Sequence, residues 1–573
     1  MDRNRKYILG LAVFVVLVIF YAISKTNSEK HISILSEAPS KIEGNLNRKN
    51  LEEEVASQEK NQASKEQQES ARKLTDTEVN QSKGGDEGII VSSSNEPSQD
   101  KKSKEETRKT LLDAVRRGVV IIKVKAYASA DSGEGSAWSG TGFIVDLEKG
   151  LIATNHHVAG DMAICTYEIK FSDGTTTTAK LKFFDPLLDF AFLTIDPKDF
   201  PKSSMVLEIS KRSIKVNDTI YSMGNSAGDE FSTYKGTVFS VYENLGPFPE
   251  QSFKFSGLTV GGASGSPVFG DDGKVVGIIY GGKFVSGAAL PINYIVRSLN
   301  QLKKGEVPSR RSIGLIPRYD DLKDVVEAGV VPESAREDYN KEFPESHNKI
   351  LVVDARLVDS PAQNLFQVGD VLWKVDGKLI GPELAKLDEI LDTSGDKTIP
   401  IEVYREGKLV QLDVKTYPLL TQSAKKFISF AGATWFNHNE QVRYMVGDKG
   451  PGVYISFAGV TSPFKELYKS SWWGGNRLLK ITHINNKPIR SLDDLQKLIP
   501  DLLGKKVFDV KYIDFLGQQS FGNTISADRQ ERWAMLKYDS KFDDPRIFEF
   551  DHITYEWDIK PLKDGASGKT LGF

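Results

Sequence analysis

The chain has 573 residues, which at about 150 residues per domain allows three or four domains with cores of their own. Its hydrophobic content of 39% is that of a soluble globular protein, and a net charge of -3 excludes the strongly basic composition that attracts nucleic acid. A single cysteine excludes intramolecular disulfides, and the seven histidines show none of the spacings of a zinc site, so we expect no metal.

The N-terminus contains the run "YILGLAVFVVLVIFYAI", Tyr7–Ile23, which is uncharged and follows three basic residues. An apolar run of this length predicts a membrane anchor over residues 1–25, with the basic leader in the cytoplasm and the remainder outside. We therefore expect a single-pass cell-membrane protein whose folded part is extracytoplasmic, and periplasmic in a bacterium. The alternative is a cleaved signal peptide, because small residues at the end of the run provide a weak cleavage site.

Residues 26–105 have the composition of a disordered linker. No aromatic residue occurs there, and Lys, Glu, Ser, Gln and Asn crowd stretches such as "ASQEKNQASKEQQES". Such a segment buries too little apolar area to offset the entropy lost on ordering. We expect a flexible spacer.

Ordered structure is predicted from about residue 106. A short amphipathic helix in "TLLDAVRRG" leads into the β-branched run Val119–Val124, and many short strand-like runs bounded by Gly, Asp, Asn or Pro follow up to about residue 305. Helical periodicity returns only in "INYIVRSLNQLKK". Residues 106–305 therefore predict an antiparallel β-barrel or sandwich closed by a helix. Polar linkers then separate two further α+β units, residues 308–418 and 425–573, the second with a C-terminal extension.

The stretch "GGASGSPVFG", Gly261–Gly270, has the composition of a turn shaped for a nucleophile. Small residues before Ser264 let the backbone turn sharply and aim successive N–H groups at one point, so the N–H groups of Gly262 and Ser264 are candidates for an oxyanion hole. By itself a Gly/Ala/Ser-rich decapeptide is also typical of an ordinary tight turn.

A base and an acid are also available in this region. Its only two histidines are adjacent, His156 and His157, and Asp189 follows before a strand-like run. A serine attacks an amide only when a base takes its proton and an acid group fixes that base. Each residue alone has an ordinary structural explanation, such as a surface histidine or a capping aspartate, and the hypothesis depends on their coincidence.

Five motifs in this order resemble those of the HtrA/Deg serine proteases, a branch of the chymotrypsin fold. The motifs are "SGTGFIVD", "LIATNHHV", "DPLLDFAFL", "YSMGNSAG" and "GASGSP". The resemblance implies a double β-barrel with His157 as the base, Asp189 as the acid and Ser264 as the nucleophile. Neighbours in an extended segment point in opposite directions, which also favours choosing one of the two histidines.

The sequence departs from the family at three positions. Ala263 stands where the family usually has asparagine and where trypsin-like digestive enzymes have aspartate, so no carboxylate is available there to bind a new N-terminus, and activation by zymogen cleavage is not expected. Ser266 replaces a glycine, and its Cβ restricts the oxyanion turn. Leu258 lies where this fold lines its primary specificity pocket, which favours cleavage after small or medium aliphatic residues.

Further along, "LVVDARLVDSPAQNLFQVGDVLWKVDGKLI" resembles a PDZ domain, so the first α+β unit is expected to be one. The resemblance implies a loop for a peptide carboxylate at Ser312, Ile313, Gly314 and Leu315, with the peptide added to a strand edge. A packed module that binds nothing is the alternative. The unit over residues 425–573 resembles a degenerate PDZ domain, with Trp472 and Trp473 either as a recognition patch or as core residues.

The fold class expected overall is a mainly β multidomain chain: a transmembrane helix, a disordered linker, a chymotrypsin-like double β-barrel and two PDZ-like α+β domains. The resemblance implies a membrane-tethered serine endopeptidase that cleaves unfolded or damaged proteins, binds peptide C-termini at the PDZ unit and assembles into homo-oligomers, commonly trimers. It implies no cofactor. The alternative function is a proteolytically idle peptide-binding scaffold or holdase chaperone.

Overall fold

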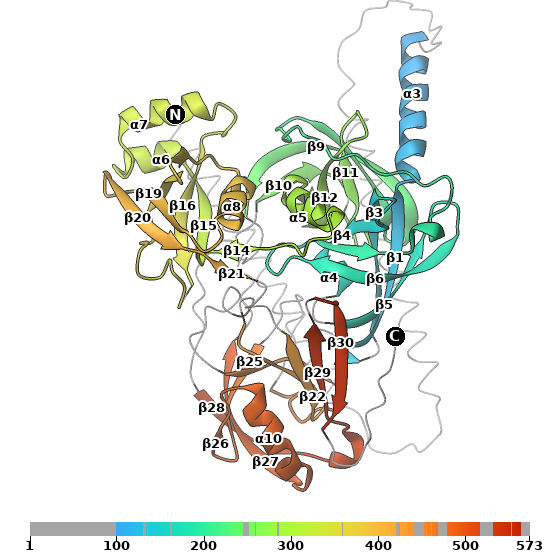
Figure 1. Ribbon diagram of the computed structural model, residues 1–573, viewed down its shortest axis with the longest axis vertical. Coiled ribbons are helices and arrows are strands. Elements are labelled where there is room, and N and C mark those ends of the chain that lie inside the picture. Colours follow the sequence, from blue (N-terminus) through green and yellow to red (C-terminus); the bar gives the residue numbers. More distant parts are fainter. Residues whose placement is uncertain are drawn as a thin grey trace, which may run out of the picture. The chain divides into compact units, whose positions relative to one another are not determined.

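A computed structural model describes residues 99–562 (Figure 1). Gaps in the description fall at 130–132, 135, 161–162, 245–250, 258, 284–285, 358, 420–424, 440–441, 443–451, 460, 468–477, 516–530 and 552. The predicted anchor, the predicted linker up to residue 98, Leu258 and the Trp472–Trp473 pair therefore lie outside the described residues.

The first sheet closes into a six-stranded antiparallel barrel. Its order is β1-β3-β4-β7-β6-β5, with β1 pairing back to β5 and the short β2 added beside β1. The strands are β1 Val119–Ser129, β2 Gly133–Glu134, β3 Ala137–Asp146, β4 Leu151–Thr154, β5 Ala163–Lys170, β6 Thr176–Phe184 and β7 Ala191–Thr194. A one-turn helix, α4 (His156–Ala159), follows β4.

The second sheet is also a closed barrel, in the order β10-β13-β12-β11-β8-β9. Its strands are β8 Thr219–Ser226, β9 Asp229–Glu243, β10 Ser252–Ser256, β11 Pro267–Phe269, β12 Val275–Lys283 and β13 Ser286–Pro291. The predicted mainly β fold with a double barrel is thus confirmed.

Strand β1 illustrates why these segments are almost continuously apolar. Val120, Ile122 and Val124 pack into one core cluster with β3, β4, β5 and β7, whereas Val119 and Ile121 pack into another. Successive side chains of a strand point to opposite faces, so a strand buried on both faces has no polar alternation.

Two helices flank the barrels in sequence. Helix α3 (Gln99–Arg116) ends directly before β1, and α5 (Asn293–Lys303) follows β13. In α5 the buried residues Tyr294, Ile295, Ser298, Leu299 and Leu302 recur at helical spacing, which is why this run folds as a helix against a core.

A third, open sheet has the order β15-β16-β17-β19-β20, with β15 at its edge. Its strands are β15 Leu315–Asp321, β16 Lys349–Arg356, β17 Val371–Val375, β18 Lys378–Leu379, β19 Thr398–Arg405 and β20 Lys408–Lys415, and β14 Arg311–Ser312 pairs separately with β21 Tyr417–Pro418. Helix α8 (Leu384–Thr393) accompanies this sheet, while α6 (Leu322–Glu327) and α7 (Glu333–Glu342) fill the segment between β15 and β16.

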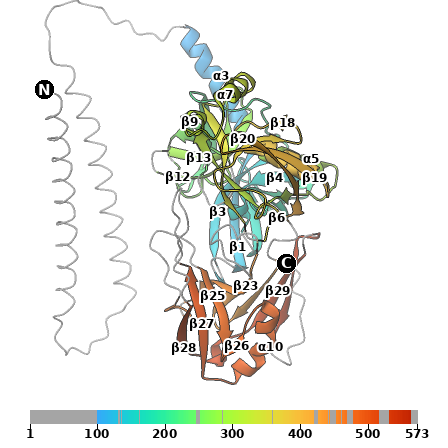
Figure 2. The same cartoon turned by 90° about the vertical axis from the view of Figure 1, so that its left-hand side faces the viewer.

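The last sheet has the order β28-β27-β25-β24-β23-β22-β29-β30. Its strands are β22 Lys426–Phe430, β23 Ala433–Asn437, β24 Val453–Ala458, β25 Leu478–Ile484, β26 Lys487–Pro488, β27 Val507–Phe515, β28 Glu531–Lys537, β29 Arg546–Asp551 and β30 Glu556–Pro561. Helix α10 (Leu492–Leu503) lies against this sheet in Figure 1 and again in Figure 2, and its buried leucines join the core of the sheet.

Candidate active site

His157 and Asp189 are brought together by two neighbouring strands of the first barrel. His157 lies in α4 directly after β4, and Asp189 lies before β7, the strand that pairs with β4. The Nδ1 of His157 is 2.6 Å from Oδ2 of Asp189, and the backbone N–H of His157 donates to Oδ1 of the same carboxylate at 2.9 Å. Both carboxylate oxygens thus fix one histidine, which leaves Nε2 of that ring as the nitrogen available to a substrate or a nucleophile.

The two adjacent histidines have different surroundings. The side chain of His157 is 47% exposed, whereas His156 is buried and stacks on Phe184 with ring centroids 4.4 Å apart. The structure therefore gives His156 a packing position and His157 a position that substrate can reach.

Asp189 also sets the charge state of its partner. Partial desolvation lowers the pKa of His157, but the charge of Asp189 and the hydrogen bond to it raise that pKa by more, so it lies above the ordinary value. Burial raises the pKa of Asp189, but the charge of His157 and the hydrogen bonds from its ring and backbone lower that pKa by more. Asp189 is consequently an anion at neutral pH and stabilises a positive charge on the ring.

The turn that carries Ser264 leaves two backbone donors open. The N–H of Ala263 donates to Val260 O and that of Gly265 donates to Ile279 O. Within the part of the chain that the structure describes, the N–H groups of Gly262 and Ser264 have no acceptor. These are the two donors expected to form the oxyanion hole, and their neighbours in the turn are not available for that role.

Gly262 is required by the shape of this turn. Its φ is +92°, and a Cβ on it would stand 2.1 Å from the backbone oxygen of Asn225. Ser266, by contrast, has no positive φ, so the side chain that replaces the family's glycine fits the turn without backbone strain. Ser266 is buried, and the Cβ of a side chain at Gly224 would meet its Oγ at 2.0 Å.

Ser264 is partly buried, and among the described residues no hydrogen bond joins its Oγ to His157. The structure thus brings the predicted base and the predicted acid together, without a described hydrogen bond from either to the hydroxyl of Ser264. In unliganded enzymes the contact between nucleophile and base is commonly long and closes when substrate binds.

Thr141 connects the turn that carries Ser264, residues 261–266, which we call the nucleophile turn after its predicted role, to the first barrel. This fully buried residue of β3 donates its N–H to Ser264 O at 2.8 Å, and its hydroxyl donates to Gly262 O at 2.9 Å. The Cβ of a residue at Gly140 would meet both the side chain of Val158 and Ser264 O, so the residues next to His157 and Ser264 pack around one point. Thr141 thus links the backbone of both predicted oxyanion donors to the barrel that carries His157.

Sequence reasoning did not assign a role to Thr141 or to Asn155. The side-chain amide of Asn155 donates to the backbone oxygen of Asp189 at 2.8 Å and so holds the turn of the acid. Both residues belong to the motifs "SGTGFIVD" and "LIATNHHV", but nothing in the sequence pattern alone indicates which atoms they contact.

The four residues predicted for a peptide carboxylate run from the last residue of β14, Ser312, to the first residue of β15, Leu315. Ile313 and Leu315 are buried, and Gly314 has a φ of +75°. The N–H of Gly314 donates to Oγ of Ser312 at 2.9 Å, so this donor is already used within the loop. Strand β15 is a free edge of its sheet, as a peptide-accepting strand has to be.

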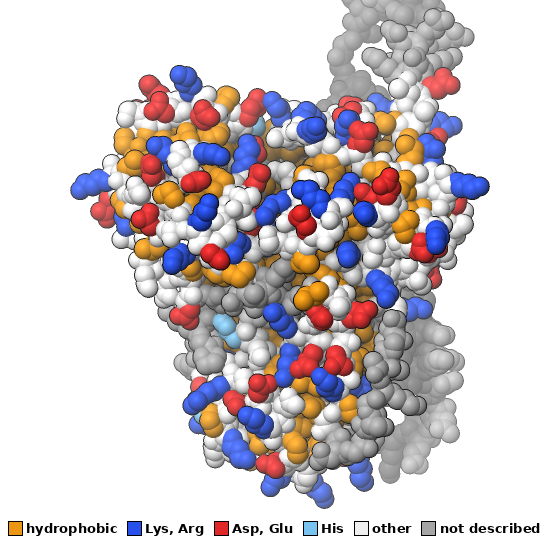
Figure 3. Space-filling view, viewed as in Figure 1, with side chains coloured by type: hydrophobic (Ala, Val, Ile, Leu, Met, Phe, Trp, Pro, Cys, Tyr) orange, Lys and Arg blue, Asp and Glu red, His pale blue; other side chains and the backbone are white. Residues whose placement is uncertain are grey.

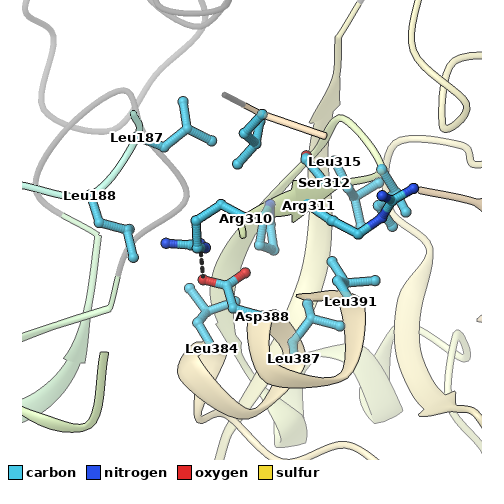
Figure 4. A pocket seen from close by; sticks show the side chains of 13 residues that line it. Leu187, Leu188, Arg310, Arg311, Ser312, Leu315, Leu384, Leu387, Asp388 and Leu391 are labelled. Atoms are coloured by element: carbon cyan, nitrogen blue, oxygen red, sulfur yellow. Dashed lines mark hydrogen bonds and ion pairs between the residues drawn. The ribbon is translucent and has the colours of Figure 1, made fainter. Parts of the chain in front are cut away.

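A pocket beside this loop is nearly filled by the chain itself (Figure 4). Leu315 and residues of α8 line it from one side, and Leu187 and Leu188, which precede Asp189, line it from another. The remaining cavity is about 30 Å³, which leaves room for a few water molecules at most. A peptide side chain can enter only if some of the lining side chains move.

Among its described residues, the last sheet offers no comparable edge beside its helix. Strand β22 pairs with β23, and Lys426 of β22 reaches Asp493 of α10 with Nζ 2.8 Å from Oδ1. The chain's own strand therefore occupies the edge of β23 that lies next to α10.

No group of three or more potential metal ligands occurs among the described side chains. Positive and negative side chains are interspersed on the face shown in Figure 3. This face therefore presents no broad surface of one charge.

Residues 140–278 match the family model described as a trypsin-like peptidase domain. The chain is 28% identical over 473 residues to the pro-apoptotic serine protease NMA111 of Phaeosphaeria nodorum, covering 79% of this chain and 44% of that protein. It is 30% identical over 363 residues to the protein of the same name from Chaetomium globosum, covering 61% and 34%. The solved structure "HtrA-type protease AlgW with decapeptide" is similar with a TM-score of 0.40 at 19% identity, over 54% of this chain and 98% of that one. The matched part of the chain thus spans less than half the length of either fungal relative.

The predicted localisation is wrong. A single-pass cell-membrane protein with an extracytoplasmic, periplasmic catalytic domain is contradicted by these relatives, which are fungal proteins named as pro-apoptotic serine proteases. Across the residues that the structure describes, every helix is too short or too polar to cross a bilayer. The prediction of a compartment depended on the hydropathy of the run Tyr7–Ile23, and hydropathy alone does not identify a compartment.

Proposed function

We propose that the chain is an HtrA-type serine endopeptidase that cleaves unfolded or damaged proteins through His157, Asp189 and Ser264. Ser264 attacks the scissile carbonyl while His157 takes its proton. Asp189 holds the imidazole in the productive tautomer, and His157 then returns the proton to the leaving amine. The N–H groups of Gly262 and Ser264 stabilise the oxyanion.

The observation that carries this proposal is the pairing of two features in one domain. The carboxylate of Asp189 binds both the ring and the backbone of His157, and the N–H groups of Gly262 and Ser264 have no acceptor among the described residues, whereas those of Ala263, Gly265 and Ser266 do. A packing site for a histidine requires neither feature.

The proposal is tested on an unfolded and a folded protein. Fluorescein-labelled casein, which is unfolded, should be cut into peptides, whereas folded, disulfide-intact ribonuclease A should stay intact. Cleavage of both at equal rates would contradict a preference for unfolded chains. Cleavage of neither would favour a proteolytically idle scaffold.

The charge state of His157 predicts the pH dependence of the reaction. The base must be neutral, and its raised pKa keeps the ring protonated to a higher pH than usual. We therefore expect cleavage of casein to fall on the acid side with a midpoint above about pH 6.5, the ordinary value for histidine. Initial rates between pH 5 and 9 measure this midpoint, and a rate that stays constant from pH 5 to 8 would rule out His157 as the base.

We further propose that the unit over residues 308–418 is a PDZ domain that binds peptide C-termini at Ser312–Leu315, in competition with Leu187 and Leu188. The free edge of β15 and the apolar pocket beside it support this assignment. The strand that occupies the edge of β23 supports a degenerate PDZ domain without such binding over residues 425–573. On the basis of the family resemblance, we also propose that the chain assembles into a homo-trimer.

The competition has a measurable consequence. Replacing the buried Leu187 by Ser should raise the affinity for a peptide with an apolar C-terminal residue roughly tenfold, because burying a leucine contributes about 1.5–3 kcal/mol and about 1.4 kcal/mol is tenfold. Fluorescence anisotropy measures the affinity. Leu409→Ser, at a half-exposed position, is the matched control and should change nothing. Equal binding of the same peptide with an amidated C-terminus would contradict the carboxylate site.

A further inference from the structure

Arg310 is a buried arginine of the segment between α5 and β14, outside both barrels. Only 6% of its side chain is exposed, and the guanidinium contacts three carboxylates. It forms an ion pair with Asp185, its Nε is 2.9 Å from Oδ2 of Asp392, and its Nη2 is 3.3 Å from Oδ2 of Asp388. Figure 4 shows the pair with Asp388 on α8.

Asp185 begins the turn that presents the catalytic acid. Its side chain is fully buried, and its Oδ1 accepts the N–H groups of Leu187 at 2.9 Å and Leu188 at 2.8 Å. Its own N–H donates to Phe190 O at 3.0 Å, which closes the turn around Asp189. We call residues 185–190 the acid turn.

The two oxygens of Asp185 thus have separate tasks. Oδ1 organises the backbone of the acid turn, and Oδ2 receives the guanidinium of Arg310. A buried carboxylate without its cation is strongly unfavourable, so the position of the acid turn depends on Arg310.

We propose that Arg310 is a positioning residue that fixes Asp189 against His157 through Asp185, so that a residue outside the protease barrels sets the geometry of the catalytic acid. The inference rests on the proposed function. Arg310 touches no reacting atom, and its effect passes entirely through the acid turn. The hydrogen bond from Asn155 to Asp189 O holds the other end of the same turn.

The charged and titratable groups around this pair come from several elements. Arg297 of α5 contacts Asp392 with Nη1 2.9 Å from Oδ2, and Tyr294 interacts electrostatically with Arg310. The pKa of Asp388 is raised to about 7, because burial raises it by more than the charge of Arg310 lowers it. Burial and then the charge of Asp185 hold the pKa of the Tyr555 hydroxyl well above its usual range.

The test measures how fast Ser264 reacts with a fluorophosphonate in the full chain, as a second-order rate constant between pH 5 and 9. Arg310→Met should lower the plateau roughly 10- to 100-fold, the loss typical of a catalytic group displaced by about 1 Å. It should also move the acid midpoint down toward about pH 6.5, because a displaced Asp189 no longer raises the pKa of His157. A fold that is merely less stable lowers the reactive fraction but does not move the midpoint.

Arg405→Met is the matched control. Arg405 forms a similar ion pair with the buried Asp370, Nη2 2.6 Å from Oδ2, in the sheet of β15–β20, away from the acid turn. We expect this variant to keep both the plateau and the midpoint of the wild type. Equal losses in Arg310→Met and Arg405→Met would assign the effect to general destabilisation and overturn the inference.

A double-mutant cycle tests the route through Asp185. Asp185→Asn should lower the plateau to a similar extent, and the double variant with Arg310→Met should cost about as much as either single change, because both act on one contact. Additive losses would contradict the route. If Arg310→Met does not fold, Arg310→Lys carries the same test, with a smaller loss and a shift in the same direction.

The two proposals fail in different ways. A wild-type chain that is not labelled at Ser264 at any pH overturns the proposed function. A wild type that is labelled, together with an Arg310→Met variant of unchanged plateau and midpoint, leaves the proposed function intact and overturns the role of Arg310.

Discussion

Replacing Ser264 by Ala should lower the turnover of casein roughly a millionfold, because in a triad that acts as a unit the loss of the nucleophile removes nearly all of the catalysis that the triad provides. The residual rate would come from the oxyanion donors and from substrate binding, which the substitution leaves in place. Release of fluorescent peptides over hours at high enzyme concentration measures the difference.

Ser203→Ala is the matched control for this change. Ser203 is an exposed serine far from the nucleophile turn in sequence, and we expect full activity from the variant. Cleavage by Ser264→Ala at more than a few per cent of the wild-type rate would mean that another residue is the nucleophile. Both variants should unfold at the wild-type temperature, which thermal unfolding followed by circular dichroism checks.

Gly262→Ala should lower the rate roughly 100- to 1,000-fold, the range seen when one oxyanion donor is lost. A Cβ at this position would be 2.1 Å from Asn225 O, and the φ of +92° is one that side chains rarely adopt. The peptide unit has to shift, and its N–H no longer points at the oxyanion. The loss should appear in kcat, with KM for casein nearly unchanged, because the donor acts in the transition state.

Gly261→Ala provides a control one residue away. A Cβ at Gly261 meets no atom within 4 Å, and its φ is not positive, so the added methyl group should leave the rate within about twofold of the wild type. A similar loss in both variants would show that the turn tolerates no side chain at all. In that case the specific role of the Gly262 N–H would be abandoned.

Much of the site can be predicted from sequence because each part has a local signature. A turn that frees two N–H groups needs small residues around Ser264, and the order of the histidine, aspartate and serine motifs follows from the strands that carry them. The argument for choosing one of the two histidines assumed an extended segment, whereas the structure places both in the one-turn helix α4, where it is His157 that bonds to Asp189.

The contacts that connect distant segments could not be predicted in this way. The hydrogen bonds of Thr141 to the nucleophile turn join residues more than a hundred positions apart, and the pair between Arg310 and Asp185 spans a similar distance. The segment "DPLLDF" indicates the start of a strand and a candidate catalytic acid. Nothing in it predicts that Leu187 and Leu188 line a pocket with α8. Such contacts depend on how separate sheets pack, which periodicity and propensity do not encode.

The segment between β15 and β16 shows the same limit. Residues Arg318–Asn348 match no motif, yet they form the end of β15 and two helices whose Tyr339 is fully buried. These two helices are too short for a helical periodicity to stand out in the sequence. They are stabilised by packing on Trp373 and its neighbours rather than by their own propensity.

The central claim is that Ser264 is a hydroxyl activated by His157. Its most direct test is to react the full chain with a fluorophosphonate at pH 8 and to locate the adduct by tandem mass spectrometry of the digested protein. We predict a single phosphonylated residue, Ser264, and no adduct there when His157 is replaced by Ala. An adduct on another serine, or none on the wild type while trypsin in the same tube is labelled to completion, would contradict the account.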